Sequence, residues 1–171
     1  MKISTILRSL LIIIVGLPAM ASAQTKWMNP TDANEPYICG RAWNKEMGKS
    51  YNRLPQRFKA TVPGRVWGNS TMTAGLTVRF VTTSPNISVK YVCTSQSYGT
   101  FNLSGMVHSG VDLYGKAADG KMHWIGNHMR WSMKGDTITI SFPKLTVPAN
   151  RRTEYTLYLP NYNGVKWLAV G

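Results

Sequence analysis

The sequence predicts an all-β fold, a sandwich or a barrel built from short strands. Apolar and polar residues alternate with a period of two in several short segments. Gly, Pro, Asn and Asp separate those segments, and no stretch after residue 23 keeps a helical period over eleven residues. Many short strands at regular spacing are typical of sandwiches and barrels.

Four segments carry the clearest alternation: residues 76–80, 87–93, 137–140 and 154–159. Each should turn one face toward a core and the other toward water or a second layer. Ser84-Pro85-Asn86 should form a corner between two of them. Asp119-Gly120 should close a hairpin between residues 111–114 and 121–125, because an Asp-Gly pair permits a positive φ. Further turns are expected at residues 134–136 and 147–150.

Residues 1–23 resemble a secretory signal. Lys2 and Arg8 are followed by an apolar run at 10–15 and by Ala21-Ser22-Ala23, a pattern that signal peptidase accepts. The run is too short to cross a bilayer, although a membrane anchor is the alternative. We therefore expect a secreted or periplasmic protein without a membrane partner once the signal is removed. Residues 24–35 should form a polar leader, and residues 36–171 a single domain.

The chain is strongly basic, with 20 Lys and Arg against 7 Asp and Glu and a net charge of +13. Such an excess attracts polyanions. The basic residues are scattered, and Arg151-Arg152 is their densest pair, so a solvated basic surface is favoured over a dedicated anion site. Export from the cell argues against a nucleic-acid partner.

Metal and cofactor signals are weak. Cys39 and Cys93 could form a disulfide in an oxidising compartment, or Cys93 could be a buried thiol in a strand. His108, His123 and His128 fit no metal-binding motif and are interpreted as surface or hydrogen-bonded histidines. We predict no metal site and no cofactor.

Catalytic signals are weak as well. Gly68-Asn69-Ser70 lacks the second glycine of a nucleophile elbow and is better interpreted as a turn after Trp67. Asp112 is the one acid inside an apolar-flanked strand, and a buried carboxylate there needs a hydrogen bond or an ion pair. Arg79 is its first candidate partner, so Asp112 is favoured as a structural residue over a catalytic one.

Tryptophan is abundant, with six residues in the chain. Each indole is favoured as core filler when taken singly, but an exposed one could stack on a sugar ring. We name Trp124, Trp131 and His108 as candidate binding residues.

Several ordered blocks resemble one known family. Ser109-Gly110-Val111-Asp112-Leu113-Tyr114 is similar to the "GxDLY" signature of the N-terminal domain of bacterial SGNH-type (Ser-Gly-Asn-His) esterases. The resemblance runs from about Pro36 to Gly171. Its other blocks lie at residues 51–55, 66–67, 74–80, 84–87 and 158–164.

The resemblance implies a jelly-roll-like antiparallel β-sandwich that precedes an α/β catalytic domain. The catalytic serine, glycine, asparagine and histidine blocks of the relatives belong to that second domain, and this chain ends near where it would begin. No catalytic residue can be carried over, so we expect a non-enzyme. Arg79, Gly110, Asp112 and Tyr114 carry the structural motif, with Gly75 and Gly110 allowing close backbone approach at strand starts.

Three hypotheses about function remain open. The first is a non-catalytic accessory module that packs on an SGNH hydrolase domain or presents a carbohydrate ester. The second is an independent carbohydrate-binding protein. The third is a hydrolase with an unrecognised site around His108, Ser109 and Asp112.

Overall fold

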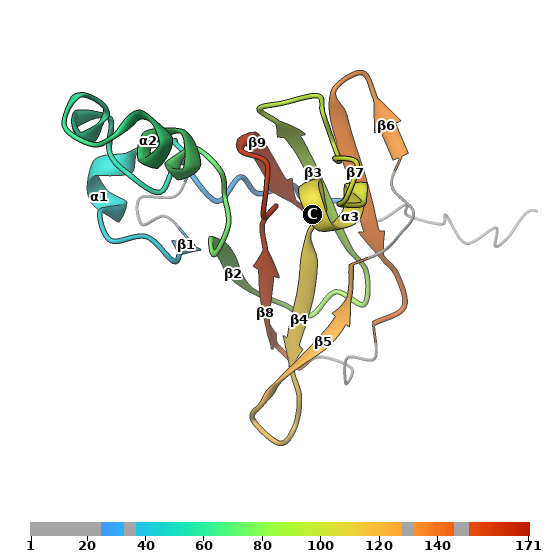
Figure 1. Ribbon diagram of the computed structural model, residues 1–171. Helices are drawn as coiled ribbons and strands as arrows, with labels where there is room; N and C mark the ends of the chain where they lie inside the picture. The colour runs from blue at the N-terminus through green and yellow to red at the C-terminus, as the bar shows by residue number, and fades with distance from the viewer. Residues whose placement is uncertain (1–24, 33–36, 128–131, 146–150) are drawn as a thin grey trace, which may run out of the picture.

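The strands of this computed structural model form two antiparallel sheets packed face to face (Figure 1). The structure describes residues 25–32, 37–127, 132–145 and 151–171. The nine strands of these residues are β1 (Ile38–Cys39), β2 (Thr77–Thr82), β3 (Ile87–Cys93), β4 (Asp112–Lys116), β5 (Met122–Gly126), β6 (Ser132–Lys134), β7 (Thr137–Phe142), β8 (Thr153–Tyr158) and β9 (Val165–Val170). The helical segments are α1 (Asn44–Met47), the 3-10 helix η1 (Gln56–Ala60), α2 (Gly64–Ser70) and α3 (Gly105–Ser109). The predicted all-β sandwich is confirmed.

The two sheets have the strand orders β1-β2-β8-β4-β5 and β6-β7-β3-β9. The consecutive strands β2 and β3 therefore belong to different sheets, and the predicted corner at Ser84-Pro85-Asn86 connects them. Within this corner the Ser84 hydroxyl donates to the Asn86 carbonyl at 2.6 Å. Such a local hydrogen bond lets the chain turn without leaving its polar backbone groups unpaired.

The alternation along the strands places one row of side chains from each sheet in the core. Val78, Leu157 and Leu113 lie in register on β2, β8 and β4, and all three have 0% exposure. On the other sheet Tyr91 is in register with Ile138 on one side and with Leu168 on the other. Burial of one such side chain stabilises the fold by about 1.5–3 kcal/mol, so these rows are the main source of its stability.

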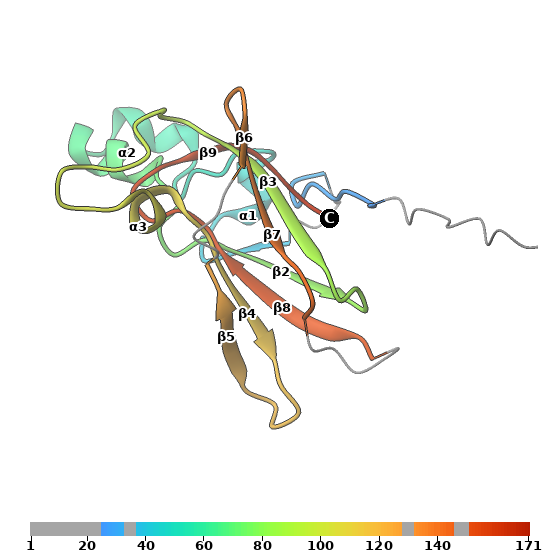
Figure 2. The same ribbon diagram turned by 90° about the vertical axis from the view of Figure 1, so that its right-hand side faces the viewer.

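The hairpin between β4 and β5 forms where Asp119-Gly120 predicted it. Gly120 has a φ of 79°, and the Asp119 carboxylate accepts a hydrogen bond from the Lys121 amide at 2.9 Å. Figure 2 shows this hairpin projecting away from the body of the sandwich. Gly135, with a φ of 58°, turns β6 into β7 as predicted, whereas the turn expected at 147–150 lies outside the described residues.

Residues 41–70 form three short helical segments beside the sheets, which we call the helical lobe (Figure 1). Strand signals gave no indication of it. Pro55 and Pro63 immediately precede η1 and α2, where a missing amide hydrogen costs little and the fixed φ suits a helix start. The predicted turn after Trp67 is wrong, because Gly68-Asn69-Ser70 forms the end of α2.

The part of the polar leader that the structure describes takes part in the fold. Met28 exchanges two backbone hydrogen bonds of 2.8 Å with Val170 at the edge of β9. Asn29 accepts a hydrogen bond from the Tyr51 hydroxyl at 3.2 Å. The expected signal at residues 1–23 lies outside the described residues. None of the helices in the described residues has the length and hydrophobicity of a membrane-spanning segment.

Candidate functional site

The outer surface of the five-stranded sheet carries a group of aromatic side chains around one carboxylate. Leu113 points into the core, so its neighbours Asp112 and Tyr114 face outward. The strand register pairs Asp112 with Tyr158 of β8 and Tyr114 with Trp124 of β5. We call Asp112, Tyr114, Trp124 and Tyr158 the aromatic face.

Contacts within the aromatic face fix its geometry. The Trp124 indole Nε1 donates a hydrogen bond to Asp112 Oδ1 at 3.2 Å. The rings of Tyr114 and Tyr158 meet edge to face, with centroids 5.2 Å apart and an interplanar angle of 62°. Trp124 is 58% exposed and Tyr158 is 43% exposed. Large aromatic side chains with a polar tip and restricted motion are typical of binding surfaces.

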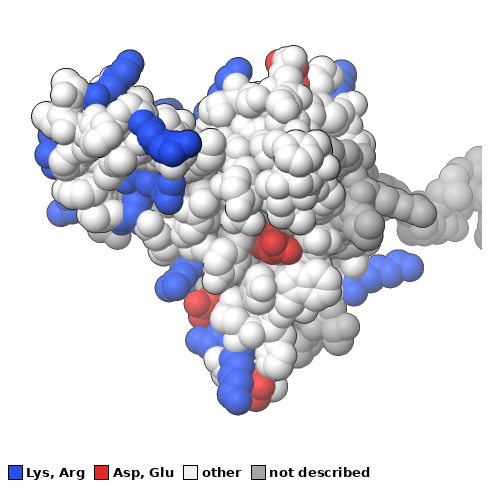
Figure 3. All heavy atoms as spheres, in the orientation of Figure 1, with Lys and Arg blue, Asp and Glu red and all other residues white. Residues whose placement is uncertain are grey.

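Figure 3 shows that the visible face over β4, β5 and β8 is largely uncharged, with acidic groups only in isolated places. Lys and Arg side chains gather instead over the helical lobe and near the end of the β4–β5 hairpin. The aromatic face is therefore a weakly charged area on a protein that is otherwise strongly basic.

Gly110 sets the direction in which the chain enters β4. It follows α3, whose first turn is capped by the Ser104 hydroxyl accepting from the Val107 amide. A Cβ atom at Gly110 would lie 2.4 Å from the Met106 carbonyl oxygen, so only glycine fits without a shift of backbone. The predicted close approach is thus confirmed at Gly110. At Gly75 it is wrong, because the space there is open and the positive φ of 80° explains the residue.

His108 and Ser109 belong to a buried network next to the start of β4. His108 Nδ1 lies 2.8 Å from the Ser109 hydroxyl, which accepts a hydrogen bond of 3.0 Å from the Asn163 side-chain amide. The Asn163 amide also donates to the Ser95 carbonyl, and its oxygen accepts from the Ser95 amide. The Tyr91 hydroxyl donates to the Ser109 carbonyl at 2.8 Å. The network joins α3 to the end of β3 and to the segment between β8 and β9.

This network does not have the form of a hydrolytic site. Ser109 has 0% exposure, so its hydroxyl cannot reach a substrate, and its second partner is the amide of Asn163 rather than a general base. Asp112 hydrogen-bonds Trp124 on the outer surface. His108, which is 8% exposed, stacks on the ring of Tyr162 at 6.0 Å. His108, Ser109 and Asp112 therefore do not converge in one open cleft.

Arg79 is not the partner of Asp112. Both residues face outward from the same sheet, but β8 lies between their strands, and Arg79 is in register with Thr156 rather than Tyr158. Asp112 instead accepts the hydrogen bond of Trp124. Arg79 lines a shallow hollow with Tyr37 and Glu154.

Cys39 and Cys93 are free thiols, so the disulfide alternative is wrong for this structure. Cys93 ends the buried row of β3, which agrees with the alternative of a buried thiol. Burial raises the pKa of Cys93 from its ordinary value to about 12, which makes the thiol unreactive at neutral pH.

The tryptophans are not core residues in the described part of the chain. Trp27, Trp43, Trp124 and Trp167 are between 37% and 58% exposed, and Trp67 is half-buried. The preference for core filling is therefore wrong for these five. The candidate binding residue Trp131 and the histidine His128 lie outside the described residues.

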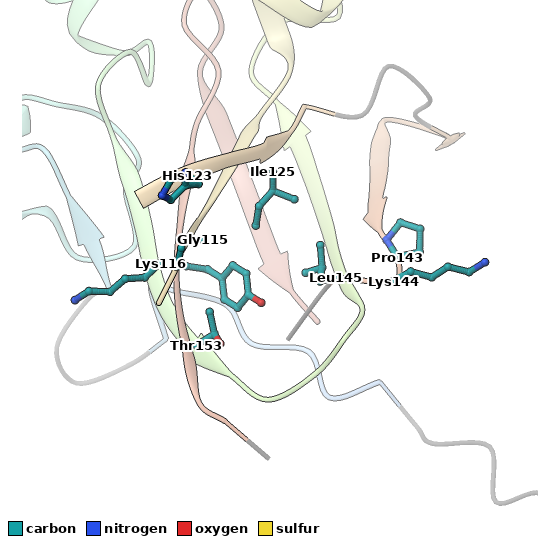
Figure 4. A pocket seen from close by; sticks show the side chains of 10 residues that line it. Gly115, Lys116, His123, Ile125, Pro143, Lys144, Leu145 and Thr153 are labelled. Carbon is teal, nitrogen blue, oxygen red and sulfur yellow. The ribbon is translucent and has the colours of Figure 1, made fainter. Parts of the chain in front are cut away.

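A separate cavity of about 430 Å³ opens between the β4–β5 hairpin, β8 and the segment after β7. Figure 4 shows Ile125 and Leu145 beside this cavity, while Lys144 extends away from it. His123 lines the cavity and pairs with Asp119 at 3.0 Å. A hydrogen bond from the Lys121 amide, and secondly the bond to His123, lower the pKa of the Asp119 carboxyl.

Potential metal ligands are not gathered anywhere in the described parts of the chain, which contain no group of three or more His, Cys, Asp and Glu side chains suited to a metal ion.

Two residues of the aromatic face and the buried network were not indicated by the sequence. Tyr158 and Asn163 lie in the closing block of the resemblance, but only the strand register places Tyr158 opposite Asp112, and only the folded structure brings the Asn163 amide to Ser109.

Comparison with known proteins agrees with this fold. A solved structure from Bacteroides ovatus, described as a GDSL-like lipase, matches with a TM-score of 0.70 and 27% identity, over 85% of this chain and 40% of that one. The chain thus spans about two fifths of that protein's length. No curated protein matches. The model of the GxDLY family, the N-terminus of SGNH hydrolase-type esterases, matches residues 25–171. Because this match covers most of the chain, the protein belongs to the GxDLY family.

Proposed function

We propose that this chain is a non-catalytic interaction module of an exported SGNH hydrolase-type esterase system, and that its aromatic face packs on the hydrolase domain. The observation that carries the proposal is the position of Asp112 and Tyr114. Both belong to the motif that names the family, yet both point away from the core. Outward-facing polar and aromatic residues in a family signature indicate contact with a partner rather than core packing.

The chemistry of the aromatic face suits a protein partner. The bond between Trp124 and Asp112 restricts the indole before any partner arrives, which reduces the entropy lost on binding. Trp and Tyr are the side chains that most often dominate the energy of protein interfaces. The weak charge of this face fits the core of an interface, from which charged residues are depleted.

A chimera provides the test. This chain replaces the matching region of the Bacteroides ovatus protein, and the melting temperature of its hydrolase domain is compared with that of the isolated domain. We expect the domain to melt several degrees higher in the chimera, because the two parts are held together at a high effective concentration.

Variants of the chimera then locate the contact. Trp124→Ala and Asp112→Ala should remove most of the rise in melting temperature, since truncating a central aromatic residue costs about 2 kcal/mol or more of binding free energy. Asp112→Asn should keep it, because its side-chain oxygen still accepts the indole hydrogen bond. Trp167→Ala, which changes an exposed tryptophan of the other sheet, is the control. The proposal is wrong if Trp124→Ala and Trp167→Ala have equal effects.

The exposure of Trp124 also favours a second candidate, the binding of a carbohydrate by the isolated chain. A 58% exposed indole held by a carboxylate could stack on the apolar face of a sugar ring. Affinity electrophoresis of the free chain on neutral polysaccharides distinguishes the two candidates. Retardation that is lost in Trp124→Ala supports the carbohydrate role, whereas unaltered migration on every neutral glycan contradicts it.

A further inference from the structure

Positive charge is concentrated in the helical lobe. The lobe is distant from the aromatic face along the chain, and it is basic whereas the aromatic face is weakly charged. Residues 41–70 contain seven Lys and Arg and a single acid, Glu46. These basic residues are spaced along the sequence without forming a run, so their spacing gave no indication of the concentration. Figure 3 shows Lys and Arg side chains over the lobe and no acidic side chain on its visible face.

Four of these seven basic residues are used within the fold. Arg57 pairs with Glu46 at 2.7 Å, and Lys49 pairs with Asp32 at 2.7 Å. The Arg41 guanidinium donates to the Ser50 carbonyl. Arg53 Nη2 donates to the Asn69 carbonyl at 2.6 Å.

The other three basic residues are available to a ligand. Lys45, Lys59 and Arg65 come from α1, η1 and α2 and are all exposed. Within the part of the chain that the structure describes, none of the three has an acidic partner. An unpaired cationic surface of this kind attracts extended polyanions.

An aromatic cluster lies within the same lobe. The rings of Trp43 and Phe58 are 5.1 Å apart, and the Arg57 guanidinium lies 4.1 Å from the Phe58 centroid and 5.8 Å from that of Trp43. Trp43 remains 37% exposed. Lys59 directly follows Phe58, so an exposed ammonium group and an exposed indole belong to neighbouring parts of the lobe.

The lobe also has little core of its own. No residue of η1 is buried, and Ser70 is the one buried residue of α2. Helices of this length gain most of their stability from packing rather than from their own hydrogen bonds. Apart from the buried Met47 and Tyr51, the large apolar side chains of the lobe are therefore half-buried or exposed, and three of its basic side chains are exposed and unpaired.

We propose that the helical lobe binds an acidic polysaccharide, with Lys45, Lys59 and Arg65 contacting carboxylate groups and Trp43 stacking on a sugar ring. A uronic acid chain complements both features of the lobe, because its regularly spaced carboxylates match the cationic side chains and its apolar ring faces match the exposed indole. A membrane surface fits less well, because the helices lack the long apolar side that an interfacial helix inserts. The inference is independent of the role proposed for the aromatic face.

Affinity electrophoresis of the purified chain in gels containing polygalacturonate tests the proposal, with neutral dextran as the reference. We expect retardation by polygalacturonate alone, weakening as salt is added. The double variant Lys59→Glu/Arg65→Glu should bind about tenfold more weakly, because two cationic contacts become repulsive. Trp43→Ala should also weaken binding, while Trp167→Ala should not.

The matched control is Lys134→Glu/Lys166→Glu, which makes the same change in net charge at exposed positions on the four-stranded sheet. We expect it to bind within about twofold of the unaltered chain. Equal losses in the two double variants would mean that net charge alone drives binding and would overturn the proposal. No retardation by polygalacturonate, or tighter binding to vesicles containing phosphatidylglycerol than to polygalacturonate, would overturn it as well.

Discussion

The sandwich and the helical lobe are built in opposite ways from the same chain. In the sandwich, rows such as Val78, Leu157 and Leu113 are fully buried and in register across strands. In the lobe, Tyr51 and Met47 are the only large side chains with less than a tenth of their surface exposed. This protein thus combines a stable scaffold with a region in which many side chains are available for contacts.

The largest expected difference between the regions is in the cost of removing an apolar side chain. Leu113→Ala should lower the free energy of unfolding by about 2–5 kcal/mol, because it leaves a cavity between the two sheets. Val66→Ala in α2 should change it by no more than about 0.5 kcal/mol, since Val66 is 46% exposed. Urea unfolding monitored by tryptophan fluorescence measures the free energy of unfolding of both variants. Similar costs at the two positions would contradict the contrast.

A smaller effect is expected from the buried polar network that borders the sandwich. Asn163→Ala should destabilise the protein by about 1–3 kcal/mol, because the Ser95 carbonyl and the Ser109 hydroxyl lose their donor. Asn102→Ala, at an exposed loop position, is the control and should be close to neutral. Esterase activity that depends on Ser109 or His108 would contradict the structural interpretation of this network.

The last effect is absent at neutral pH and concerns the thiol of Cys93 at high pH. Its pKa is raised from 9.0 to about 12, so the folded state keeps the proton that the unfolded state loses. Its contribution to stability is therefore fully present below pH 9 and decreases as the pH rises toward 12. Thermal melts across this window should show a steeper decline for the unaltered chain than for Cys93→Ala. An equal decline would show that Cys93 contributes nothing to the pH dependence.

Thiol counting complements those melts. Ellman's reagent should find two reactive thiols in the unfolded chain without any reductant, since both cysteines are free. In the folded chain at neutral pH, Cys93 should stay unlabelled because it is buried. Detection of thiols in the unfolded chain only after reduction would restore the disulfide alternative.

Much of the sandwich could be predicted from the sequence, because a half-buried strand imposes a period of two on its residues. β3 repeats a buried and a half-buried position along its whole length, and the Asp119-Gly120 hairpin follows from local turn chemistry. The helical lobe could not be predicted in this way. Its helices are too short to establish a period, and tertiary hydrogen bonds such as that from Arg41 to Ser50 keep them in place.

The candidate site was only partly predictable for a different reason. Asp112 and Trp124 could be chosen by their residue type, but the pairing of Asp112 with Arg79 failed because a sequence does not give the order of strands in a sheet. β8 separates β2 from β4, and Trp124, which is in register with Tyr114, reaches diagonally across the strand pair to Asp112. Contacts between distant segments depend on that topology.

The pairing of Met28 with Val170 brings residues 25 and 171 together as well, because a Cβ atom built on Gly171 would lie 2.7 Å from a side-chain carbon of Thr25. A short linker could therefore join these two positions, and the chain could be reopened at the exposed tip of the β4–β5 hairpin without disturbing the core. The fold should tolerate such circular permutation, which would allow the domain to be inserted as a cassette into a surface loop of another protein.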